Sequence, residues 1–218
     1  MPKIAGVKFT YSLKLSECAY DSKDIKPKDF VVVRSAQGEE IGQVVFVNKK
    51  QISEQDLFGE ILRKATDEDL QKKEELENEA RELFAVFSEK INKYNLKMNP
   101  IGVSYSLDET KVVFYYTADG RVDFRELAKD LSRNLKKQAI LRQIGPRDEA
   151  KLVGGYGRCG LPVCCATFMT NSYGITMGDA EKVYGMPKNA AKISGLCGRL
   201  MCCIKFEEKI ETKKKEKL

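Results

Sequence analysis

The sequence predicts an α+β protein with a small N-terminal β unit, a long charged helix, a β-β-α-β unit and a cysteine-rich C-terminal region. Three observations predict it: β-rich runs within the first 48 residues, an apolar helical period after Thr66, and six cysteines gathered in two short C-terminal segments. The composition, 42% hydrophobic and 32% charged, is that of a folded chain rather than a disordered one. We divide the chain into residues 1–65, 66–98, 99–150, 151–206 and a charged tail, 207–218.

The first unit is expected to be β-rich. Residues 3–10 alternate loosely between apolar and polar side chains. Residues 30–34 (FVVVR) and 41–47 (IGQVVFV) are rich in β-branched residues and flank the segment 35–38, which ends in glycine. This pattern predicts a hairpin.

A long charged helix is expected to follow. Thr66 begins the sequence T-D-E-D, which predicts an N-cap followed by acids in the first turn, where the helix dipole favours them. Apolar residues then recur at helical spacing, which predicts one face that packs on the core or on a partner. These residues are Leu76, Ala80, Leu83, Phe84, Phe87 and Ile91. The helix should end near Asn95, before Pro100.

Residues 100–145 predict a β-β-α-β unit. Strands are expected at 101–106 and 111–117 around a turn at 107–109, and another at 139–144, ended by Gly-Pro. Between them, a helix after Asp123 should present one apolar face. That face comprises Phe124, Leu127, Ala128, Leu131 and Leu135.

Composition also narrows the function and the compartment. The chain has no histidine, which excludes Ser-His and Cys-His nucleophile pairs and HExxH metal sites. No secretory signal and no membrane-spanning run is present, so we expect a cytoplasmic protein whose thiols stay reduced. The net charge of +6 permits contact with nucleic acid without requiring it. The tail, 207–218, is expected to be solvated.

Six of the seven cysteines form an internal repeat. The segments RCGLPVCC, residues 158–165, and LCGRLMCC, residues 196–203, align with a constant offset of 38 residues. A glycine follows the first cysteine in both. The repeated residues are Cys159, Cys164 and Cys165 in the first segment, and Cys197, Cys202 and Cys203 in the second. Cys18 stands outside the repeat and is expected to be a core thiol.

Metal ligation explains this repeat better than its two alternatives. Structural disulfides are expected in exported chains, and inert buried thiols would not recur at matched spacing beside matched glycines. Thiolates without imidazole indicate a zinc site or an iron–sulfur cluster. Arg158 and Arg199, next to the cysteines, are ordinary surface charges or offset the charge of a thiolate cluster.

The number of thiols leaves the division of ligands open. Six thiolates exceed one tetrahedral zinc site and fall short of two. Either each motif supplies three ligands and the missing ones come from elsewhere, or four ligate here and two face a partner. On an extended backbone the two cysteines of each doublet would point to opposite sides.

One motif is discounted. Residues 155–160 match G-x-G-x-x-G, and Lys151–Val153 before them could be a strand. A dinucleotide site also requires a helix that opens at the glycines. Leu-Pro-Val and a cysteine doublet follow here instead.

The two segments GGYGRCGLPVCC, 154–165, and KISGLCGRLMCC, 192–203, resemble the bacterial RicT/YaaT family, which belongs to the polymerase-suppressor (PSP) C-terminal domain family. The β-rich beginning, the charged helix and residues 123–155 fit the same family, so the resemblance covers nearly the whole chain. It implies a non-enzymatic regulator that binds a 4Fe–4S cluster through the six repeated cysteines.

The resemblance also implies partners. Such proteins form a complex with RicA-like and RicF-like small helical proteins, associate with ribonuclease Y, and direct messenger RNA maturation and turnover. The family is linked to sporulation, competence and biofilm formation. Direct RNA contact is left open, and a zinc-stabilised RNA-binding module is the alternative. A thiol redox enzyme is disfavoured because no C-x-x-C is present.

Overall fold

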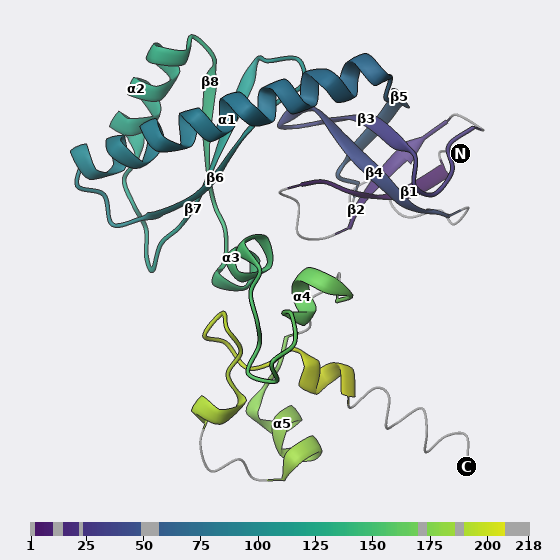
Figure 1. Ribbon diagram of the computed structural model, residues 1–218, viewed down its shortest axis with the longest axis vertical. Helices are drawn as coiled ribbons and strands as arrows, with labels where there is room; N and C mark the ends of the chain where they lie inside the picture. The colour runs from purple at the N-terminus through teal and green to yellow at the C-terminus, as the bar shows by residue number, and fades with distance from the viewer. Residues whose placement is uncertain are drawn as a thin grey trace. The chain divides into compact units, whose positions relative to one another are not determined.

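The computed structural model describes residues 3–10, 15–21, 24–48, 57–169, 174–185 and 190–207, and it confirms the α+β prediction (Figure 1). The chain divides into two compact units, Met1–Ile144 and Gly145–Leu218. The first contains a barrel and a helix-covered sheet, and the second contains the cysteine repeat. Beyond Glu207, the predicted charged tail lies outside the described residues.

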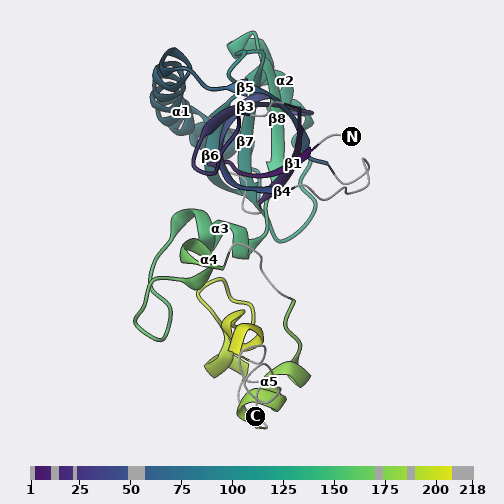
Figure 2. The same ribbon diagram turned by 90° about the vertical axis from the view of Figure 1, so that its right-hand side faces the viewer.

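Five strands close into an N-terminal barrel, seen as a ring in Figure 2. They are β1 (Lys3–Lys8), β2 (Ser16–Tyr20), β3 (Phe30–Ser35), β4 (Gly38–Asn48) and β5 (Gly59–Lys64). The order around the ring is β1-β2-β5-β3-β4, with β2 and β5 parallel and all other neighbours antiparallel. The hairpin is confirmed, whereas β2 and β5 were not predicted.

The interior of the barrel is filled by side chains from all five strands. Cys18 is fully buried there, which confirms the expected core thiol, and burial raises its pKa to about 12. The barrel has no room for a side chain at Gly42, because a Cβ at this position would lie 2.3 Å from Cγ1 of Val7. The barrel is therefore a packed core rather than a channel.

The hairpin between β3 and β4 ties the barrel to the following sheet. Gly38 closes its turn with φ +111°, and a Cβ there would lie 2.8 Å from the Cβ of Ser106. The Leu107 N–H donates to the Glu39 carbonyl at 2.6 Å, and Lys111 Nζ donates to the Ala36 carbonyl at 2.9 Å. These contacts join the barrel and the sheet into one unit.

Helix α1 (Asp67–Lys93) begins at the predicted residue. The Thr66 side chain accepts from the Asp69 N–H, and the Asp69 carboxylate accepts from the Thr66 N–H in return, which forms a capping box. Arg63 forms an ion pair with Asp69. The helix ends at Tyr94, next to Asn95 in the left-handed region at φ +50°. Five of the six predicted apolar positions are buried, and Phe84 is partly buried.

The predicted β-β-α-β unit is also confirmed. It consists of β6 (Asn99–Tyr105), β7 (Lys111–Thr117), α2 (Arg125–Leu135) and β8 (Gln138–Gln143), with sheet order β6-β7-β8. Strands β7 and β8 are parallel, as expected for a connection through a helix. Buried residues of α1 and α2 form one core with this sheet, including Phe87, Leu127 and Phe114.

The second unit is built from short elements. They are α3 (Pro146–Val153), α4 (Cys164–Thr167), α5 (Met177–Tyr184), η2 (Ala190–Ile193) and a helical segment at 203–207. Helix α3 was not predicted, and the suggested strand at Lys151–Val153 is wrong because Pro146 starts a helix through this segment. None of the helices in the described parts of the chain is both long and apolar enough to cross a membrane.

We expect Thr66→Ala to lower the free energy of unfolding by about 1 kcal/mol, because it removes the N-cap hydrogen bond of α1. Urea denaturation followed by circular dichroism measures this change. Glu82→Ala is the control, since Glu82 is exposed in the middle of the same helix. Equal effects of both substitutions would contradict a capping role.

The contribution of Asp69 to stability should depend on pH. Hydrogen bonds from Arg63, and then from Thr66, hold the pKa of Asp69 well below its usual range. A carboxyl group whose folded pKa is depressed stabilises the fold above its unfolded pKa, about 3.9, and loses that contribution as pH falls through the folded pKa. The difference in urea midpoint between the wild type and Asp69→Asn should therefore stay constant from pH 7 to about pH 5 and shrink as the pH falls below about 3.9. A difference that stays constant below about pH 3.9 would contradict this.

Candidate metal centre

The first cysteine motif folds as a tight hairpin, here called knuckle 1 (residues 155–166). The Gly157 N–H donates to the Leu161 carbonyl at 2.8 Å, and the Gly160 N–H donates to the Gly157 carbonyl at 3.0 Å. Gly160 has φ +76°. This is the pattern of a three-residue hairpin loop that ends in a left-handed glycine. Cys159 occupies the loop.

The second motif, knuckle 2 (residues 193–204), repeats this structure 38 residues later. The Gly195 N–H donates to the Arg199 carbonyl at 2.8 Å, and the Gly198 N–H to the Gly195 carbonyl at 3.0 Å. Gly198 has φ +73°, as Gly160 does within a few degrees. Two further backbone bonds recur with the same offset: Val163 to Gly155 and Ala166 to Val163 in knuckle 1, and Met201 to Ile193 and Ile204 to Met201 in knuckle 2. The sequence repeat is therefore a structural repeat.

The glycines beside the cysteines have distinct roles. Gly160 and Gly198 supply a left-handed backbone that other residues adopt only with strain. At Gly157 a Cβ would lie 3.5 Å from Sγ of Cys159, which is ordinary van der Waals contact and places this thiol over the turn. Gly195 stands in the same relation to Cys197, with a distance of 3.8 Å.

The cysteine doublets start short helices. Cys164 and Cys165 open α4, and Cys203 opens the helical segment 203–207 immediately after Cys202. The expectation of an extended doublet is therefore wrong. Neighbouring side chains on a helix diverge by about 100° rather than pointing to opposite sides. Cys165 is buried at 9% exposure, whereas Cys164, Cys202 and Cys203 are partly exposed.

Equivalent residues just beyond the two knuckles contact each other. Phe168 and Phe206, which are also separated by 38 residues, lie with ring centroids 5.2 Å apart and ring planes tilted by 60°. This contact joins residues that are related by the repeat, just after the doublet of each motif. The second unit thus packs its two motifs as a pair.

Further contacts hold this pair together. A Cβ at Gly155 of knuckle 1 would lie 3.1 Å from Cδ2 of Leu196 in knuckle 2. Arg147 of α3 donates to the Leu200 carbonyl at 3.2 Å. Lys205 forms an ion pair of 2.7 Å with Asp179, which also caps α5.

The thiols of the two motifs lie close enough to affect one another's ionisation. Burial raises the pKa of Cys164, and the thiolates of Cys202 and Cys159 raise it further. Burial likewise raises the pKa of Cys165, with contributions from Cys202 and Cys197. For Cys203, burial and Glu207 are the main causes, and the pKa rises to about 11. Electrostatic interactions thus connect thiols of the first motif with thiols of the second.

The donor set fits a thiophilic metal or cluster by its chemistry. Within the described residues, however, no three Cys, Asp or Glu side chains are already arranged as a metal site. Cys159 in its loop is exposed, so a metal bound by these thiols would require side-chain rotation or loop movement. Raised thiol pKa values mean that ligation would release protons, because the thiolate is the ligand.

Two other sequence features resolve differently. Arg158 and Arg199 are exposed and form no ion pair in the parts of the chain that are described, so their role stays a prediction. The G-x-G-x-x-G match at residues 155–160 is the hairpin of knuckle 1, not the start of a helix. That geometry supplies no helix N-terminus for a pyrophosphate.

Sequence reasoning missed two features of this site. Phe168 and Phe206 extend the repeat beyond the cysteines, and their matched offset could have been noticed. The contact between Gly155 and Leu196 could not, because Leu196 is equivalent to Arg158 rather than to Gly155. Large apolar side chains are also exposed around the knuckles. They include Tyr156 at 72%, Leu161 at 65%, Leu196 at 56% and Phe168 at 56%.

Comparison with known proteins identifies relatives over the whole chain. A family model described as the PSP1 C-terminal conserved region matches residues 59–144, and one described as the third domain of PSP1-like proteins matches residues 175–218. The stage 0 sporulation protein YaaT of Bacillus subtilis (strain 168) is 42% identical over 220 residues, which cover 99% of this chain and 79% of that protein. The uncharacterized protein PB7E8.02 of Schizosaccharomyces pombe is 28% identical over 138 residues, 50% of this chain and 18% of that protein. No solved structure matches.

We expect Gly155→Ala to separate the knuckles, because the new methyl group would press on Leu196. The reaction of Cys165 with a thiol reagent should become faster, measured by absorbance under reducing-agent-free, anaerobic conditions. Gly154→Ala is the control, since Gly154 also has a positive φ but a Cβ there meets no atom within 4 Å.

A second substitution separates crowding from backbone strain. Gly155→Ala combined with Leu196→Ala should react more slowly than Gly155→Ala alone, because the shortened side chain restores the space. If the double variant reacts as fast as the single one, the contact does not position the knuckles.

Proposed function

Because this chain belongs to the YaaT family of PSP1 proteins, we propose that it is a non-enzymatic regulator of messenger RNA processing and turnover that holds an iron–sulfur cluster on its two knuckles. The observation that carries this proposal is the contact between two cysteine hairpins that form the same backbone hydrogen bonds. It supports a cluster because both motifs contribute to one neighbourhood of thiols.

We infer a cluster of the 4Fe–4S type rather than zinc from the resemblance to the family. Six thiols exceed the four that either a tetrahedral zinc site or one 4Fe–4S cluster binds, so two thiols are left to face a partner. An iron–sulfur cluster takes cysteine thiolates and is tuned by nearby backbone N–H groups, which both tight loops provide. The candidate ligands are the six repeated cysteines, Cys159, Cys164, Cys165, Cys197, Cys202 and Cys203.

The surface of the knuckles supports a shared site. Tyr156 and Leu161 in knuckle 1 are large apolar residues, and each is more than half exposed. Exposed apolar residues of this kind are typical of surfaces where a partner docks. We propose that RicA-like and RicF-like helical proteins bind here and supply further ligands. The complex then acts through ribonuclease Y. The name of the Bacillus subtilis relative states a role in sporulation. We propose the same role for this chain.

The proposed mechanism couples ligation to shape. Cys159 and Cys197 lie in loops whose thiols must move to complete a site. Ligand binding that requires such movement orders the loops, since metal binding and local folding are coupled. Ordered knuckles would present one surface to the partners, and knuckles without a cluster another. Partner binding that survives replacement of all six cysteines by serine would exclude this mechanism.

We expect protein purified without oxygen to contain iron and sulfide in near-equal amounts, lost on replacement of the six cysteines by serine. Elemental analysis and absorption spectra, with and without the partner proteins, measure this. Cys18→Ser is the matched control, because Cys18 lies in the barrel core. Zinc without sulfide in both preparations would instead favour the zinc-stabilised RNA-binding module.

A cellular test addresses the function itself. We expect this chain to restore sporulation and normal transcript lifetimes in a Bacillus subtilis strain that lacks YaaT, and the six-serine variant to fail at equal protein level. Spore counts and RNA half-lives measure the outcome. Rescue by the six-serine variant would show that the cysteines do not carry the function.

A further inference from the structure

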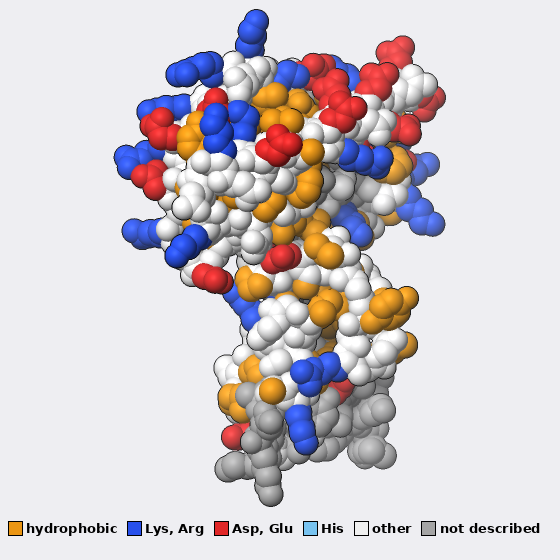
Figure 3. Space-filling model, turned by 60° about the vertical axis from the view of Figure 1, so that its left-hand side comes forward, with side chains coloured by type: hydrophobic (Ala, Val, Ile, Leu, Met, Phe, Trp, Pro, Cys, Tyr) orange, Lys and Arg blue, Asp and Glu red, His pale blue; other side chains and the backbone are white. Residues whose placement is uncertain are grey.

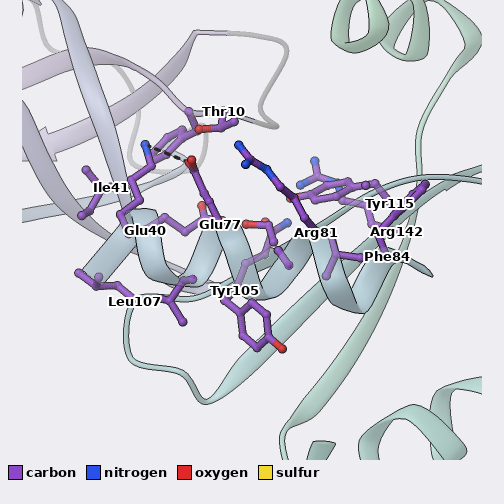
Figure 4. A pocket seen from close by; sticks show the side chains of 18 of the residues that line it. Thr10, Glu40, Ile41, Glu77, Arg81, Phe84, Tyr105, Leu107, Tyr115 and Arg142 are labelled. Carbon is purple, nitrogen blue, oxygen red and sulfur yellow. Dashed lines mark ion pairs between the residues drawn. The ribbon is translucent and has the colours of Figure 1, made fainter. Parts of the chain in front are cut away.

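The first unit contains a cleft that the proposed function does not use. Its volume is about 420 Å³, and it lies between α1, the barrel and strand β6 (Figure 4). Five consecutive residues of β6, Ile101 to Tyr105, line it from both faces of the strand. On the surface of one face of the molecule, shown in Figure 3, small groups of apolar side chains lie among charges of both signs.

Strand β6 is the edge of its sheet and pairs only with β7 among the described strands. Two hydrogen bonds show which backbone groups of β6 face β7. The Ser106 N–H donates to the Lys111 carbonyl, so Ser106 faces β7, and the Ile144 N–H donates to the Tyr116 carbonyl, so Tyr116 faces β8. In an antiparallel pair these groups alternate along the strand. Val103 and Tyr105 therefore direct their N–H and C=O groups away from β7.

These outward N–H and C=O groups form no hydrogen bond with another described residue. Val103 is only 2% exposed, so its outward N–H and C=O are also largely removed from water. Buried backbone groups without partners are rare and costly in proteins. At the start of the strand, Pro100 and a bulge near Gly102 interrupt the edge, as proteins commonly do to block unwanted pairing. The second half of β6 has neither device.

The walls of the cleft combine an apolar floor with a charged rim. Leu76, Ala80 and Phe84 of α1 form the floor. On the rim, the side chains of Lys73 and Glu77 form an ion pair of 3.8 Å. Arg81, one helical turn further along α1, donates a hydrogen bond to Asn78 and forms no ion pair with a described residue.

Arg142 of β8 adds a second cation to the rim. It is exposed and forms no ion pair with any described residue, although it lowers the pKa of Glu40, which burial raises. Figure 4 shows the Arg81 and Arg142 side chains within the same cleft. The lining of the cleft therefore carries three cations, Lys73, Arg81 and Arg142, against the two carboxylates Glu40 and Glu77. The hydrogen bond from the Leu107 N–H to the Glu39 carbonyl holds the barrel wall against the sheet.

We propose that this cleft binds an extended acidic peptide of another protein, which adds to the free edge of β6 as a further strand. The peptide backbone pairs with Val103 and Tyr105, one face of the strand packs on Leu76 and Phe84, and carboxylates meet Arg81 and Arg142. Strand addition of this kind takes affinity from backbone bonds and specificity from alternate side chains.

A nucleic acid fits the cleft less well. Base stacking requires exposed aromatic faces. Of the aromatic residues that line the cleft, Tyr115 and Phe9 are buried at 2% and 5% exposure, Phe84 is partly exposed, and Lys137 lies over the ring of the partly exposed Tyr105. Outward N–H and C=O groups that alternate along one strand match another peptide backbone and not a phosphate chain.

The test uses the full chain and a phage-displayed library of random octapeptides. We expect enrichment of peptides that alternate apolar and acidic residues. Arg81→Gln and Arg142→Gln should each weaken the binding of a selected peptide by at least about tenfold, since each removes a charge-assisted hydrogen bond. Arg133→Gln is the matched control, because Arg133 is an exposed arginine of α2 outside the cleft.

N-methylation of the selected peptide tests strand pairing directly. Methyl groups are placed on every second backbone nitrogen of the peptide, in one or the other of the two alternating sets. Methylation of the set whose N–H groups face β6 should abolish binding, and methylation of the other set should leave binding unchanged. Equal effects of methylation in the two sets would overturn the proposal. No enriched peptide would also overturn it, as would binding of oligouridylate that depends on Arg81 and Arg142.

Discussion

The left-handed backbone at Gly160 and Gly198 is the constraint on which the cysteine region depends. Each glycine closes a hairpin loop that carries one cysteine and returns the chain so that a doublet can start a helix. Because both loops use the same bonds, the two motifs present similar surfaces, and Phe168 can meet Phe206. A side chain at either glycine would strain the turn before it touched any ligand.

Local signals in the sequence were enough to predict the central helix and the sheet. Thr66 and Asp69 form a capping box from adjacent residues, and the apolar period of α1 needs no partner to be recognised. Strands β2 and β5 were missed because they are short and their parallel pairing joins residues about 40 positions apart, such as Cys18 and Gly59. Helix α3 was missed because Gly145-Pro146 signals a turn as readily as a helix start.

The residues of the candidate site could be predicted from the sequence, but their arrangement in space could not. Spacing alone grouped the six cysteines, and the offset of 38 identified two copies of one motif. The helical start at Cys164 and Cys165 depends on the preceding hairpin, so a reading of the doublet as extended was wrong. The contact of Gly155 with Leu196 joins positions that are not equivalent in the repeat. Such asymmetric packing is a tertiary property and leaves no periodic signal.

The two units differ sharply in how much apolar material holds them together. In the described residues, the core of the second unit is a cluster of three buried side chains, Ala180, Ile193 and Ile204, whereas the two main clusters of the first unit contain eleven and ten. A fold with so small a core takes much of its stability from whatever cross-links it. In the proposed cluster-bound state, loss of the cluster would therefore unfold the described residues of the second unit while the barrel and sheet persist, so the chain would report cluster loss by local unfolding.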